Sequence, residues 1–72
     1  MTKDEILQII ANTIEVDIVD ESLELNDDIW DSLSIIIFIA AINQDFGKIL
    51  DPQEVFSAKT AKDLIDLSMQ DL

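Results

Sequence analysis

Apolar residues near the start of the chain recur at the spacing of an amphipathic helix. These residues are Ile6, Leu7, Ile10 and Ile14, and in a helix they would lie on one face. Ahead of them, Thr2 and Glu5 have the spacing of a capping box, in which the hydroxyl and the carboxylate each accept a hydrogen bond from a backbone N–H. The pattern predicts a first helix from about residue 3 to 15.

The helical period fades between Val16 and Trp30, where Ser22 and Asn26 are turn-forming residues. Carboxylates crowd this segment, namely Asp17, Asp20, Glu21, Glu24, Asp27 and Asp28. A connection of roughly 15 residues is long for a compact domain, and such loops are often functional. We expect apolar side chains to anchor the loop on the core: Val16, Ile18, Leu23, Leu25 and Ile29.

A second helix is predicted to begin at Asp31 or Ser32 and to end at Gly47, which suits a left-handed stop position. At about 100° per residue its apolar side chains form two stripes on nearly opposite sides. One stripe consists of Ile35, Ile39, Ile42 and Phe46, and the other of Leu33, Ile36, Ile37 and Ala40. Because a small bundle can bury only one of them, the other is exposed, covers a neighbouring element or receives a partner.

The last third of the chain predicts two more helices. Asp51 followed by Pro52 is typical of a helix start, and it opens a short helix that ends at about Phe56 or Ser57. Thr60 is the expected cap of a final helix, whose buried face would consist of Ala61, Leu64, Ile65, Ser68 and Leu72. The predicted fold class is therefore an all-α bundle of three main helices and one short helix, with a long first loop.

Composition indicates one folded domain over residues 1–72, because 49% of the residues are hydrophobic and there is only one Gly and one Pro. The formal net charge of −12 disfavours nucleic acid and anionic membranes as partners, since their phosphates would be repelled. The longest apolar run, residues 35–42, is far shorter than the roughly 20 residues that span a bilayer. The start of the chain lacks the pattern of a signal peptide. We expect a cytoplasmic monomer whose partners carry basic patches.

The residue types present argue against catalysis by the polypeptide itself. The chain has no Cys and no His, so thiolate metal sites and the commonest acid–base group are both absent. The acidic loop does not predict a calcium site either, because the segment 20–25 lacks the glycine that an EF-hand loop needs at its sixth position. We therefore expect neither an enzyme nor a metal protein.

The segment with the most distinctive chemistry joins the acidic loop to the second helix. Ser32 falls at the start of this helix, where unpaired N–H groups and the positive end of the helix dipole favour a negatively charged group such as a phosphodiester. The ordinary alternative is that Asp31 is an N-cap and Ser32 an exposed first-turn residue.

Asp31, Ser32 and Leu33 resemble the Asp-Ser-Leu motif of the acyl carrier protein family. The resemblance extends to the length, the acidity, the long first loop and the order of helices, and it implies the four-helix bundle of that family. It also implies that a phosphopantetheinyl transferase attaches 4′-phosphopantetheine from coenzyme A to Ser32, with Asp31 and Leu33 as the recognised motif. The arm would carry an acyl or aminoacyl group as a thioester to loading and processing enzymes of fatty acid, polyketide or related secondary metabolism.

By the same resemblance, the exposed side of the second helix would recognise partner enzymes. The expected docking residues are Trp30, Leu33, Ile36, Ile37 and Ala40. This chain departs from the family pattern because no acidic residue lies between Asp31 and Asp45. Three alternatives stay open: these residues pack against the long loop, the protein is an acidic helical adaptor without covalent cargo, or it is an acidic mimic of nucleic acid. Only a carrier needs the hydroxyl of Ser32.

Overall fold

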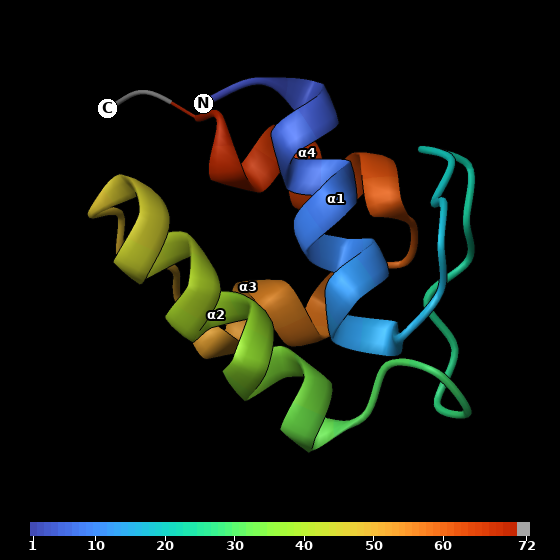
Figure 1. Ribbon diagram of the computed structural model, residues 1–72. Coiled ribbons are helices and arrows are strands. Elements are labelled where there is room, and N and C mark those ends of the chain that lie inside the picture. Colours follow the sequence, from blue (N-terminus) through green and yellow to red (C-terminus); the bar gives the residue numbers. More distant parts are fainter. Residues whose placement is uncertain (71–72) are drawn as a thin grey trace.

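The computed structural model describes residues 1–70, and this part of the chain contains four helices and no strand. They are α1 (Lys3–Ile14), α2 (Ser32–Phe46), α3 (Pro52–Ser57) and α4 (Ala61–Ser68). Helix α1 packs against α2 and α4, α3 contacts the same two helices, and the long loop runs along one side (Figure 1). This helical bundle confirms the predicted fold class. No described helix has the length and apolar character that a membrane crossing requires.

Each helix begins directly after the residue whose side chain caps it. Thr2 and Glu5 form the predicted capping box of α1, and Thr60 forms a second one with Asp63 at the start of α4. Helix α2 ends at Gly47, whose φ of 70° is in the left-handed region that glycine adopts without strain. The predicted start of α1, end of α2 and start of α4 are confirmed to within one residue. Leu72, which was expected on the buried face of α4, lies outside the described residues.

The core is built mainly from isoleucine and leucine of α1, α2 and α4 around two aromatic rings, those of Trp30 and Phe38. Ile6 and Ile10 of α1 and Leu64 of α4 are fully buried. In α2 the expected stripe is confirmed in part, because Ile35 and Ile42 are buried while Ile39 and Phe46 are half-buried. Phe38, which neither predicted stripe included, is 0% exposed. Its ring lies on the core side because it is three residues after Ile35 and four before Ile42.

The long loop is anchored by different side chains from those expected at its start. Leu23, Leu25 and Ile29 are partly buried, as predicted. The prediction was wrong for Val16 and for Ile18, which is 86% exposed. Val19 is buried instead. Successive side chains of an extended segment point to opposite sides, so burial of Val19 leaves its neighbour Ile18 in solvent.

Backbone hydrogen bonds attach the middle of the loop to the start of α4. The N–H of Leu25 donates to the carbonyl of Lys59 at 2.8 Å, and the N–H of Ala61 donates to the carbonyl of Leu23 at 2.9 Å. An exposed ion pair of 2.8 Å also joins Lys3 of α1 to Glu21. The loop is therefore held at its centre, and its last residues lead directly into α2.

We predict that two of the three phenylalanines of this chain, Phe38 and Phe56, differ strongly in their effect on stability. Phe38→Ala should lower the free energy of unfolding by about 3–5 kcal/mol, because it leaves a cavity in the core. Phe56→Ala is the matched control, since Phe56 is 73% exposed, and it should change stability by no more than about 0.5 kcal/mol. Urea unfolding followed by circular dichroism measures both, and equal losses would contradict the described core.

The cap of α4 should persist in acid below the ordinary range of aspartate. The N–H groups of Lys59 and Thr60 donate to the Asp63 carboxylate at 3.0 and 3.2 Å, and the first of these bonds is the main reason that the pKa of Asp63 is lowered from its ordinary value of 3.8. A lowered pKa means that the stabilisation is complete above the ordinary value and is lost as the pH falls through the lowered one.

An NMR titration tests this expectation through the amide signals of Lys59 and Thr60, which should move together with the Asp63 carboxyl below pH 3.8. In Asp63→Ala the same amides should show no such transition. Movement of the wild-type amides at a higher pH would show that the cap does not hold the carboxylate in its charged form.

Candidate functional site

Ser32 is the first residue of α2, and its side chain is exposed. The preceding Asp31 is the N-cap, whose carboxylate accepts a hydrogen bond of 2.9 Å from the N–H of Ser34. This bond is the main reason that the pKa of Asp31 is lowered, so Asp31 is anionic at neutral pH and closes the first turn. Within the described part of the chain, the Ser32 hydroxyl makes no hydrogen bond. It is therefore a free hydroxyl at a fixed place.

Trp30 has a different position from the one expected. It was predicted to lie on the docking face, but its side chain is only 5% exposed and belongs to the core. Its ring meets Phe38 edge to face, with the ring centroids 5.6 Å apart. The prediction failed because a large aromatic side chain at the end of a loop can turn inward, where it buries far more apolar area than it would on the surface.

The remaining docking candidates share one exposed side of α2. Leu33 and Ile36 are both 63% exposed, and Ile37 and Ala40 are exposed as well. The alternative in which the long loop covers this stripe is therefore wrong. We refer to Leu33, Ile36, Ile37 and Ala40 as the apolar face of α2.

Sequence reasoning missed one extension of this apolar face. A shallow hollow beside it is lined by Ile36, Ile39, Ala40, Asn43, Ile49 and Pro52. Ile49, in the connection between α2 and α3, is highly exposed, while the adjacent Leu50 is buried. The run Ile49-Leu50 was the available signal, because in an extended segment only one of two neighbours can face the core. The exposed apolar surface therefore continues from α2 toward the start of α3.

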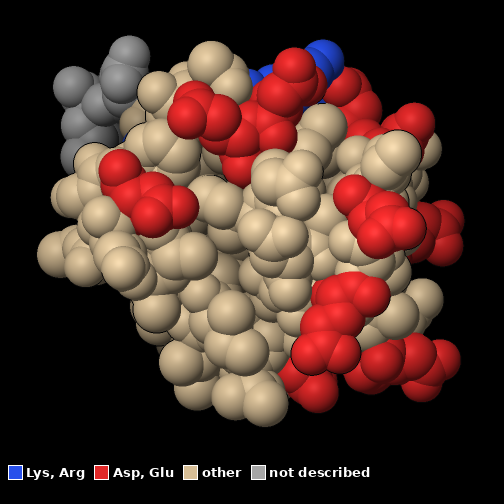
Figure 2. All heavy atoms as spheres, viewed as in Figure 1, with Lys and Arg blue, Asp and Glu red and all other residues tan. Residues whose placement is uncertain are grey.

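Charge is distributed unevenly around this surface. Helix α2 has no acidic residue before Asp45, whereas eight of the 16 acidic residues lie between residues 15 and 31. In the view of Figure 2 the surface over α2 carries few charged side chains, and acidic side chains gather over the long loop. Half of the acidic residues therefore lie in the segment that leads into the end of α2 that carries Ser32.

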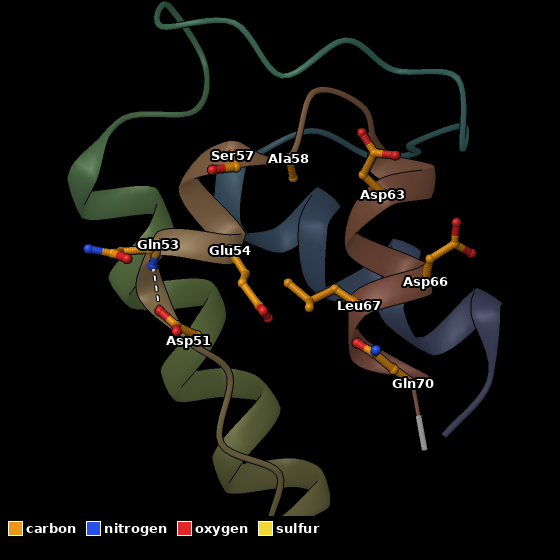
Figure 3. A pocket seen from close by; sticks show the side chains of 9 residues that line it. All are labelled: Asp51, Gln53, Glu54, Ser57, Ala58, Asp63, Asp66, Leu67 and Gln70. Atoms are coloured by element: carbon orange, nitrogen blue, oxygen red, sulfur yellow. Dashed lines mark hydrogen bonds between the residues drawn. The ribbon is translucent and has the colours of Figure 1, made fainter. Parts of the chain in front are cut away.

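A broad open hollow between α3 and α4 is also acidic, and its carboxylates include Asp51, Glu54, Asp63 and Asp66. Figure 3 shows Glu54 from α3 and Leu67 from α4 pointing toward each other across it. Asp51 and Asp63 are occupied as helix caps, and Lys62 pairs with Asp66 at 3.0 Å. Among the described residues, no group of three or more His, Cys, Asp or Glu side chains is arranged to hold a metal ion.

These observations leave Ser32 as the residue best placed for covalent attachment of a phosphate-bearing group. Its hydroxyl is exposed and free, and the positive end of the α2 dipole would favour the negative charge of a phosphodiester on that oxygen. The residues present therefore fit a phosphopantetheine group.

Comparison with known proteins identifies the family of the chain. A family model described as "Phosphopantetheine attachment site" matches residues 4–68, which include all four helices except the first residue of α1. Searches of curated proteins and of solved structures give no match. Because the family model covers most of the chain, the protein belongs to the phosphopantetheine attachment site family and is a carrier domain of the type that holds 4′-phosphopantetheine covalently.

Proposed function

We propose that this protein is an acyl carrier protein in which Ser32 holds the 4′-phosphopantetheine arm. The observation that supports this most directly is the exposed, unbonded hydroxyl of Ser32 at the first position of α2, within the matched region. When bound, the arm supplies a thiol that carries an acyl or aminoacyl group as a thioester. The protein acts as a monomeric cytoplasmic shuttle, without catalysis of its own, for enzymes of fatty acid, polyketide or related secondary metabolism.

The residues around Ser32 have separate parts in its modification. Asp31 holds the first turn of α2 through its hydrogen bond to Ser34, so that the serine oxygen has a defined direction. Leu33 is exposed beside Ser32 and offers the transferase an apolar contact. The chain contributes position rather than reactivity, since a phosphopantetheinyl transferase brings coenzyme A and the metal ion.

Partner enzymes dock, we propose, on the apolar face of α2. This face begins next to Ser32, so an enzyme bound to it has the attachment point at the edge of the interface. The acidic loop lies at the same end of the helix and attracts basic surfaces over a distance of about 10 Å at moderate salt. Attraction by the loop then guides approach, and apolar contact with α2 provides most of the affinity.

We predict that a broad-specificity phosphopantetheinyl transferase with coenzyme A will add one phosphopantetheine unit to the protein. Intact-mass spectrometry before and after the reaction measures the gain. Ser32→Ala should gain nothing, whereas Ser34→Ala, two residues along the same helix, should still gain one unit. If the wild type stays unmodified beside a control carrier, or if Ser32→Ala gains as much, the protein is better explained as an adaptor without covalent cargo.

A second prediction concerns the apolar face of α2. Ile36→Glu and Ile37→Glu should leave the helical circular dichroism spectrum unchanged, because both side chains are exposed. Each should raise the KM of the transferase for this protein by about tenfold or more, since a fully buried isoleucine contributes about 1.5–3 kcal/mol.

Ile18→Glu is the matched control, because Ile18 is an exposed isoleucine on the long loop beside α1 and not on α2. It adds the same negative charge, yet it should change the KM little. Unfolding of either α2 variant would show that this face is core, and equal KM values for all three variants would place recognition elsewhere.

A further inference from the structure

We infer that Trp30 is a positioning residue for the modification of Ser32. Its buried indole holds the end of the long loop against the core, and this contact fixes the first turn of α2 in which the serine lies. The inference rests on the proposed role of Ser32 as the attachment residue. It replaces the expectation that Trp30 is part of the docking face.

The first argument is the place of Trp30 along the chain. Asp31, Ser32 and Leu33 are all exposed, so no side chain of the motif reaches the core. The nearest buried side chains on either side are Trp30 and Ile35, which are both almost fully buried. The motif is therefore a short exposed span between two buried anchors, and Trp30 is the one on the loop side.

The second argument is the contact that Trp30 makes. Its ring lies edge to face on Phe38 at a centroid distance of 5.6 Å and an interplanar angle of 67°, a favourable geometry for two aromatic rings. Phe38 belongs to α2 and is the fully buried centre of that helix. Trp30 thus ties the loop to the same helix that carries Ser32, so the loop and the helix are held at a fixed angle across the motif.

The backbone around Trp30 extends this attachment. The N–H groups of Ile29 and Trp30 both donate to the carbonyl of Asn26, at 3.2 and 2.8 Å, and the side chain of Asn26 accepts from the N–H of Asp28 at 3.0 Å. Residues 26–30 therefore form a closed turn. The hydroxyl of Ser34 donates to the carbonyl of Ile29 at 3.4 Å and links this turn to the first turn of α2.

The polar Nε1–H of the indole does not contribute to the anchoring of the loop by Trp30. Its Nε1–H is buried and has no acceptor among the described residues, and an unpaired buried donor opposes folding. The ring itself must then provide the anchoring, through its apolar area and its contact with Phe38. Phenylalanine keeps an aromatic ring and lacks the unpaired N–H, so Trp30→Phe should preserve the function of the anchor while Trp30→Ala should lose it.

The experiment compares Trp30→Ala, Trp30→Phe and Ile6→Ala in the full chain. Ile6 is fully buried in the first half of α1, and in Figure 1 the start of α1 lies at the opposite end of the molecule from the start of α2. Ile6→Ala therefore loses core packing away from the motif. Hydrogen exchange of the Ser34 and Ile35 amides, which both donate to Asp31, is measured by NMR, and the KM and kcat of the transferase are measured with coenzyme A.

We expect Trp30→Ala to speed exchange at these two amides more than Ile6→Ala does, and to raise the KM about tenfold with an unchanged kcat. That pattern follows if only about one tenth of the molecules hold the first turn in the form the transferase binds. Trp30→Phe should restore both measurements. Should Trp30→Ala not fold, Trp30→Leu takes its place in the same comparison.

The inference is overturned if the Trp30 variant and Ile6→Ala have the same exchange pattern in the first turn of α2, or if Trp30→Phe restores stability but not the KM. Failure of the proposed function has a different signature, because the wild type itself then gains no phosphopantetheine or Ser32→Ala gains as much. In that case the exchange measurements still decide whether Trp30 holds the motif in place.

Discussion

Packing of Phe38 against the core is the constraint on which the functional surface depends. This ring and its neighbours Ile35 and Ile42 are buried, and they fix the rotation of α2 about its axis. A rotation of the helix by one residue would expose the ring. The observed rotation places Ser32 and the apolar face of α2 in solvent. The function proposed for the exposed side therefore depends on buried residues that a partner docked there would not touch.

Charged side chains contribute little to the stability of the fold, but their placement determines which surfaces are acidic and which are apolar. The three ion pairs among the described residues are exposed, and pairs of this kind contribute little to stability. With a net charge of −12, the carboxylates repel one another, and placing half of them between residues 15 and 31 concentrates this cost in the loop. The same arrangement leaves α2 without a charged residue before Asp45, so a partner docked as proposed would bury its apolar face without desolvating a carboxylate.

Local signals were sufficient to predict the helices, whereas the loop and the rotation of α2 depended on contacts distant in sequence. Thr2 with Glu5, Asp51 with Pro52, and Gly47 act on backbone groups within a few residues, so the sequence contains their full effect. Ser32 could be placed at the start of α2 for the same reason. Trp30 could not be placed, because its burial depends on Phe38 eight residues later and on a loop without a period. Phe38 was missed because α2 is apolar on two sides, so periodicity did not identify the side that faces the core.

The junction at residues 30–33 combines these two kinds of information. Asp31 fixes the direction of the helix through a local hydrogen bond to Ser34, and Trp30 fixes the place of that helix end through a tertiary contact. Neither interaction suffices alone, since a well-capped helix can still move as a body and an anchored loop can still lead into a frayed turn. On the proposed function, Ser32 needs both, because each enzyme that acts on it would recognise the hydroxyl or its attached group from the position of the surrounding surface. The one tryptophan of the chain therefore lies at the point where the loop leads into the helix.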